Sequence, residues 1–113
     1  MFLPQKNKDL IQSCIYSSKE YWDTTNLSKI DKRLKPDAVI LDIGANIGNH
    51  TLYWANERQA KKVFAFEPYP SSYQILKTNI KLNNLEKVVK VFNFALSDEN
   101  TKAQVCGFCA ENI

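Results

Sequence analysis

The sequence predicts an α/β protein in which helices cover a parallel β-sheet. Short apolar runs alternate with segments of helical periodicity from residue 38 onward, and this alternation is typical of parallel α/β folds. The first apolar run, Val39-Ile40-Leu41, leads through Asp42 into a glycine turn and then into a helical segment. In α/β proteins, a strand, a glycine turn and a helix N-terminus in that order hold nucleotide-like ligands. We therefore expect a Rossmann-like sheet with a ligand site at the carboxyl end of the first strand.

Length and composition set the bounds of this prediction. The chain has 113 residues, of which 44% are apolar and 24% charged, as expected for one folded domain. Its net charge of +3 comes from dispersed lysines, so the composition predicts no nucleic-acid partner. No apolar run approaches the roughly 20 residues that span a bilayer, and the three cysteines form no dense disulfide pattern. The sequence therefore predicts a cytoplasmic protein without a membrane partner.

Residues 1–36 are predicted to be a helical segment that precedes the sheet. Apolar residues recur at spacings of three and four between residues 6 and 22, with Leu10 and Trp22 among them. This spacing predicts an amphipathic helix. A second, shorter helix is expected between residues 24 and 34. Both helices are expected to cover an edge or a face of the core.

Residues 37–113 are predicted to be the cofactor-binding half of a Rossmann-like domain. The expected elements are a strand at 38–43, a helix from 47 or 49 to 58, a strand at 63–66, a helix at 70–83, a strand at 88–94 and an extended segment at 103–108. Because the first strand is almost continuously apolar, we expect burial on both its faces inside a larger sheet. The chain is thus expected to be a truncated domain. The alternative is a small protein whose copies complete the sheet as a homo-oligomer.

The residues after the first strand favour a ligand with an amino-acid head. Gly44 and Gly48 lack a Cβ, so the backbone can turn tightly and a ligand can approach it closely. Asn46, between them, tolerates unusual backbone angles and carries an amide. Free N–H groups at the start of the following helix favour a carboxylate. Asp42 offers its own carboxylate to an ammonium group, and capping of the turn is its alternative role.

An acidic residue at the end of the second strand points to a ribose. Glu67 follows Gly44 by 23 residues, and a carboxylate placed in this way accepts hydrogen bonds from two ribose hydroxyls. Pro68 fixes the chain just after it. The loop lacks the third glycine of the dinucleotide fingerprint. This disfavours a pyrophosphate and favours a nucleoside that carries an amino-acid arm.

Three blocks of this sequence, residues 42–51, 66–68 and 93–98, resemble the FkbM-type family of S-adenosylmethionine-dependent methyltransferases. The resemblance implies a class I methyltransferase fold with a seven-stranded mixed sheet, incomplete in this chain, and S-adenosylmethionine as the cofactor. It also implies methyl transfer to a hydroxyl of a small molecule or sugar. The residues that it implies for cofactor binding are Asp42, Gly44, Asn46, Gly48, Asn49, His50, Thr51, Glu67, Pro68, Ala95 and Leu96.

Within this set, the resemblance implies contacts with each part of the cofactor. Residues 42–48 would line the methionine end, and residues 49–51 would lie near the methionine carboxylate. Glu67 would bind the ribose diol. Ala95 and Leu96, after the third strand, would lie beside the adenine.

The sequence assigns no catalytic residue and no metal site. A hydroxyl acceptor needs a general base, but His50 follows the glycine loop directly, where a structural or cofactor contact is favoured over that role. Cys106 and Cys109 stand in an extended segment without a second cysteine pair, which favours neither redox chemistry nor zinc binding. Two alternatives stay open. One is an NAD-type Rossmann oxidoreductase domain, and the other is a non-catalytic binding or assembly module.

Overall fold

The structure is a computed structural model that describes residues 1–99. Its three strands are parallel and lie in the order β1-β2-β3, so the predicted α/β fold with a parallel sheet is confirmed. No helix within the described residues is long and apolar enough to cross a membrane. The predicted segment 103–108 and the Cys106–Cys109 pair lie outside the described residues. The elements are α1 (Leu10–Ser18), α2 (Thr24–Asp31), β1 (Val39–Ile43), α3 (Asn49–Leu52), η1 (Tyr53–Glu57), β2 (Lys62–Phe66), α4 (Pro70–Leu82) and β3 (Val89–Phe92).

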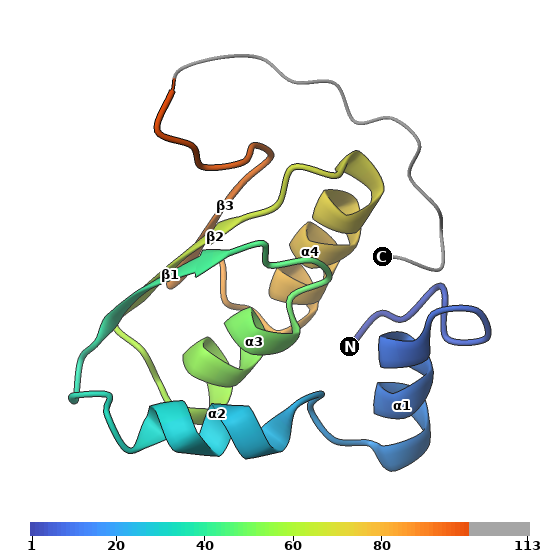
Figure 1. Ribbon diagram of the computed structural model, residues 1–113, viewed down its shortest axis with the longest axis horizontal. Coiled ribbons are helices and arrows are strands. Elements are labelled where there is room, and N and C mark those ends of the chain that lie inside the picture. Colours follow the sequence, from blue (N-terminus) through green and yellow to red (C-terminus); the bar gives the residue numbers. More distant parts are fainter. Residues whose placement is uncertain (100–113) are drawn as a thin grey trace.

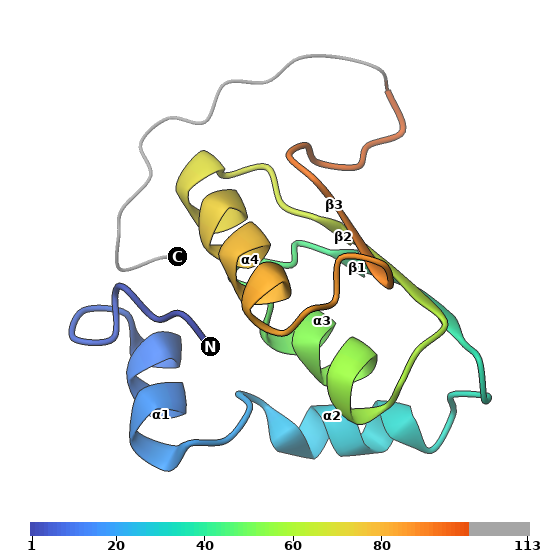
Figure 2. The same ribbon diagram turned by 180° about the vertical axis from the view of Figure 1, so that it is seen from behind.

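Helices α3 and α4 cover one face of the sheet (Figures 1 and 2). The strand side chains on this face are buried or partly buried, and those of Val63 and Ala65 in β2 have no exposed surface. They belong to one apolar cluster with Leu52 of α3 and Leu76 and Ile80 of α4. Burial of a large aliphatic side chain stabilises a fold by about 1.5–3 kcal/mol. This layer therefore holds the three strands in register beneath the loops that follow them.

The opposite face of the sheet carries apolar side chains that are exposed in the described part of the chain. On β1, the side chains of Val39, Leu41 and Ile43 are 58%, 59% and 63% exposed. Beside them, the rings of Phe66 and Phe92 stack with centroids 5.0 Å apart. The prediction that the first strand is buried on both faces is therefore wrong for residues 1–99. The reason is that the described helices pack against the other face of the sheet, so within residues 1–99 no helix covers this one.

The first helix is shorter than its apolar pattern predicts. It begins after Asp9, whose Oδ1 accepts the backbone N–H of Gln12 at 2.8 Å, as an N-cap does. It ends at Lys19, whose left-handed φ of 62° turns the chain out of the helix. Consequently Trp22 lies beyond the helix. Leu10, in its first turn, is exposed. Local capping, rather than apolar spacing, therefore sets the length of α1.

Helix α2 is held against the segment formed by α3 and η1. Leu27 of α2 is 1% exposed and belongs to the same buried cluster as the sheet residues. Tyr53 of η1 donates its hydroxyl hydrogen to Oδ2 of Asp31. Arg58 Nε lies 3.1 Å from Oδ1 of the same carboxylate. These contacts place α2 on the core, and the domain boundary predicted at residue 36 stays a prediction.

The contact between Tyr53 and Asp31 makes stability depend on pH in the alkaline range. The hydrogen bond to Asp31, together with burial, raises the pKa of Tyr53 above its ordinary value, which is about 10. The stabilisation is therefore fully present below pH 10 and is lost as the pH rises through the raised pKa. Urea unfolding at pH 8 and pH 11 is expected to show a smaller alkaline loss in Tyr53→Phe than in the unmodified chain. Tyr73→Phe in α4 is the control, and an alkaline loss unchanged by Tyr53→Phe would contradict the assignment.

Candidate cofactor-binding site

The carboxyl ends of the three strands meet at one edge of the sheet, and hydrogen bonds join them there. The N–H groups of Gly44 and Ala45, after β1, both donate to the Phe66 carbonyl of β2 at 2.9 Å. The Asn93 amide, after β3, donates to the backbone carbonyls of Glu67 at 2.9 Å and Pro68 at 3.1 Å. The structure therefore brings together the three segments that the sequence assigns to the cofactor. Sequence reasoning gave Asn93 no role, although it stands in one of the quoted blocks.

The glycine loop turns three times through left-handed backbone, at Gly44 (φ 77°), Asn46 (φ 53°) and Gly48 (φ 101°). The two glycines have different surroundings. A Cβ added to Gly44 would meet no atom within 4 Å, so this glycine faces open space. A Cβ added to Gly48 would lie 2.9 Å from Cδ1 of Leu76. Gly44 thus leaves room for a ligand, whereas Gly48 lets α4 pack closely against the loop.

Glu67 lies where β2 ends, and the residue is 7% exposed. Its Oε1 accepts the N–H of Asn46, and its Oε2 accepts the N–H of Tyr69, each at 2.8 Å. An ionised carboxylate offers about four lone-pair directions, so these two bonds leave acceptor capacity on both oxygens. The residue therefore fits the ribose diol of a nucleoside, and it also holds the glycine loop in place.

Three other predicted residues support helix α3. Asp42 is 9% exposed, and its Oδ2 accepts the hydroxyl hydrogen of Thr51, which is fully buried. The Asn49 amide accepts the N–H of Trp22 at 2.7 Å and donates to the Trp22 carbonyl at 2.8 Å. These side chains tie the start of α3 to β1 and to the segment before α2. Their contact with a cofactor stays a prediction.

The remaining predicted residues lie around this edge. His50 turns toward the start of α2, where its Nε2 is 4.0 Å from Oδ2 of Asp23, and its side chain is 43% exposed. Ala95 and Leu96 are exposed in the segment after β3. Pro68 is exposed and contributes its carbonyl to the Asn93 bond. The contacts of these four residues with a cofactor also stay predictions.

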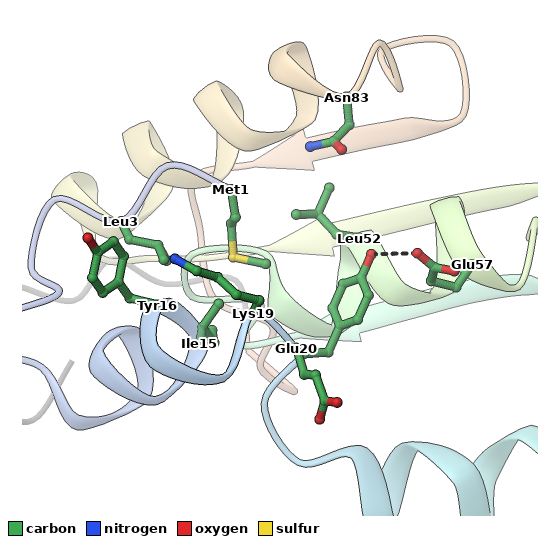
Figure 3. Close-up of a pocket in the computed structure, with 10 residues that line it drawn as sticks. Met1, Leu3, Ile15, Tyr16, Lys19, Glu20, Leu52, Glu57 and Asn83 are labelled. Carbon is green, nitrogen blue, oxygen red and sulfur yellow. Dashed lines mark hydrogen bonds between the residues drawn. The ribbon is translucent and has the colours of Figure 1, made fainter.

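A pocket of about 520 Å³ lies elsewhere, between α1, the amino-terminal residues and the end of α4 (Figure 3). Leu3 and Ile15 line it with Leu52 of α3, and Tyr21 donates a hydrogen bond to Glu57 at its border. Burial, with the nearby Glu57 carboxylate, raises the pKa of Tyr21. Neither the glycine loop nor Glu67 lines this pocket, so it is distinct from the predicted cofactor site.

Structural comparison identifies the class of protein. The chain is similar to TYW2 of Pyrococcus horikoshii in complex with MeSAdo, with a TM-score of 0.53 and 34% sequence identity over 59% of this chain and 25% of that one. The fold is that of a class I S-adenosylmethionine-dependent methyltransferase. Residues 9–106 match the family model of the TRM5/TYW2 methyltransferase domain. The chain belongs to this family.

Two curated relatives share part of this sequence. The AMB antimetabolite synthetase AmbE of Pseudomonas aeruginosa is 45% identical over 65 residues, which are 58% of this chain and 3% of that protein. The tRNA (guanine(37)-N(1))-methyltransferase of Homo sapiens is 38% identical over 79 residues, which are 67% of this chain and 15% of that protein. The chain therefore spans a small part of the relatives that it matches.

The comparisons correct the predicted family. The FkbM-type assignment is wrong, because the family model that matches the chain is that of the TRM5/TYW2 methyltransferase domain. The blocks behind the assignment surround the predicted cofactor site, and a shared cofactor demands similar residues there in different families. S-adenosylmethionine as the cofactor is confirmed. Neither the NAD-type oxidoreductase nor the non-catalytic module gains support.

The comparisons also correct the predicted partners. The sequence predicted a small-molecule acceptor, no nucleic acid and a homo-oligomer as one way to complete the sheet. The human relative is instead a tRNA methyltransferase, so the exclusion of nucleic acid is wrong. The exclusion rested on the dispersed charge of this chain, which covers only 15% of that relative.

Proposed function

We propose that this chain is the cofactor-binding part of an S-adenosylmethionine-dependent tRNA methyltransferase. The observation that carries the cofactor half of this proposal is the Glu67 carboxylate, which stands at the end of β2 with acceptor capacity beside a glycine loop. The relationship to a tRNA (guanine(37)-N(1))-methyltransferase supports the tRNA half. We also propose a cytoplasmic location, which the odd number of cysteines favours.

Each of the site residues would contact a different part of the cofactor. Glu67 would accept hydrogen bonds from the ribose diol, and the exposed Ala95 and Leu96 would lie beside the adenine. The open space at Gly44 would admit the amino-acid arm. When bound, S-adenosylmethionine supplies a methyl group on a sulfonium sulfur, which leaves as the neutral thioether of S-adenosylhomocysteine. These residues would then contribute by holding the methyl carbon in line with the acceptor.

Calorimetric titration of residues 1–113 tests the cofactor half. We expect heat of binding with S-adenosylmethionine and with S-adenosylhomocysteine, because both carry the ribose and the amino-acid arm. NAD is expected to give none, since the loop lacks the third glycine of a pyrophosphate site. Binding of NAD without either sulfur nucleoside would overturn this half of the proposal.

A tRNA assay tests the other half. The chain is incubated with S-adenosylmethionine carrying a labelled methyl group and with two tRNA transcripts, one with guanosine and one with adenosine at position 37. We expect the label in the guanosine transcript, with S-adenosylhomocysteine as the second product. A gel-shift titration with the same transcripts reports RNA binding in the absence of transfer. Neither label nor a shift with either transcript would overturn the tRNA half and leave the cofactor half standing.

A further inference from the structure

A buried amide on α4 joins the glycine loop to the amino-terminal residues. Asn79 has no exposed surface and lies on the same side of the helix as the apolar Leu76 and Ile80. A polar side chain in such a place is unfavourable unless its polar atoms are hydrogen-bonded. The Asn79 Nδ2 donates to the carbonyls of Ile47 at 2.8 Å and Phe2 at 3.3 Å. Its Oδ1 accepts the backbone N–H of Phe2.

The bond to Ile47 acts on the geometry of the loop. The Ile47 carbonyl and the Gly48 N–H belong to one peptide group, and that N–H donates to the Ala45 carbonyl at 2.9 Å. Both polar ends of this planar group are therefore bonded, which sets its orientation. The left-handed φ of Gly48, 101°, is the rotation by which the chain leaves this peptide group. On its other side, the loop is held by Glu67 through the N–H of Asn46.

We propose that Asn79 is the positioning residue of the glycine loop, and that it couples the loop to the amino-terminal residues 1–3. Figures 1 and 2 show the amino terminus between α1 and α4. Phe2 offers Asn79 both its N–H and its carbonyl, so docking of this segment orients the amide that holds Ile47. Loss of either contact is expected to loosen the loop. The effect on cofactor affinity rests on the proposed function, whereas the effect on loop geometry does not.

Selective labelling with ¹⁵N-glycine tests loop geometry directly. The chain contains three glycines, so its amide spectrum holds three signals, among them those of Gly44 and Gly48. In Asn79→Leu, we expect the Gly48 signal to move and its hydrogen exchange to quicken about tenfold. The Gly44 signal should change less, because its N–H bonds to the Phe66 carbonyl of β2. A merely structural Asn79 would lower the unfolding temperature and leave the native Gly48 signal in place.

Two further variants keep the test decisive if Asn79→Leu does not fold. Asn79→Asp keeps the shape and the acceptor for Phe2, but it sets a second oxygen against the Ile47 carbonyl, so the Gly48 signal should again move. Phe2→Pro removes the N–H of residue 2 and leaves Asn79 intact, and it should move the Gly48 signal less.

Asn83→Ala is the matched control, since the Asn83 side-chain amide donates to the backbone carbonyl of Asn79 and not to the loop. A Gly48 signal that moves no more than that of Gly44 in the folded Asn79 variants would overturn the inference.

The same samples separate this inference from the proposed function. Titration with S-adenosylhomocysteine is expected to show about tenfold weaker binding to Asn79→Asp than to the unmodified chain. If the unmodified chain binds no S-adenosylhomocysteine, the cofactor proposal fails, while the glycine signals still decide whether Asn79 holds the loop. If the Gly48 signal moves and the affinity does not change, Asn79 holds the loop but the loop does not contribute to cofactor binding, and only the expected effect on affinity is overturned.

Discussion

Alanine at Gly48 is expected to destabilise the fold more than alanine at Gly44. Both positions have left-handed φ, 101° and 77°, which costs a residue with a Cβ about 1–3 kcal/mol. At Gly48, the new methyl group would also lie 2.9 Å from Cδ1 of the fully buried Leu76. Overpacking of this kind costs about 1–3 kcal/mol more. Urea unfolding of the two variants measures the difference directly.

Gly44→Ala is expected to affect the cofactor more than the fold. Its methyl group would enter open space, which is where the proposed cofactor would lie. Titration with S-adenosylhomocysteine should therefore show affinity lowered about tenfold or more, a change of about 1.4 kcal/mol, in a variant that still unfolds cooperatively. Equal loss of stability in Gly44→Ala and Gly48→Ala would contradict the different surroundings that the structure gives the two glycines.

Replacement of Glu67 by glutamine is expected to weaken both the loop and cofactor binding. The carboxylate accepts one N–H from Asn46 and one from Tyr69. Glutamine keeps one acceptor oxygen but turns an NH₂ group toward the other N–H. Because hydrogen bonds to a charged group contribute about 1.5–3 kcal/mol, we expect Glu67→Gln to lose stability of that order. We also expect about 10–100-fold lower affinity for S-adenosylhomocysteine.

Glu86→Gln is the matched control, because Glu86 is exposed in the turn before β3 and the substitution makes the same change of charge. We expect Glu86→Gln to change the free energy of unfolding and the cofactor affinity only as far as the loss of one negative charge does. Unchanged affinity in Glu67→Gln, with lower stability, would mean that Glu67 holds the loop without contacting the ribose.

The elements nearest the site agree with the sequence because local signals set their limits. Helix α4 begins at Pro70, as predicted, since proline suits the first turn of a helix. Strand β2 starts one residue earlier than predicted and ends at Phe66 as predicted, because its apolar run stops at Glu67. The roles of side chains are harder to predict. The bonds of Asn79 to Phe2 join residues 77 positions apart, so no local pattern contains them. The one sequence signal for Asn79 is that a polar residue stands three positions after Leu76, on the apolar side of a helix.

The sequence by itself determined the order of strands and helices, the glycine turn after the first strand and the acidic residue at the end of the second. These features follow from short-range physics, namely the period of apolar residues, the backbone freedom of glycine and the constraint of proline. The tertiary structure alone decided which glycine leaves space for a ligand and which one packs against α4. It also decided that, within residues 1–99, β1 lies at an edge with an exposed apolar face, and that Asp42 and Asn49 hold helix α3. These properties depend on which distant atoms surround a residue, and a linear pattern carries no such distances.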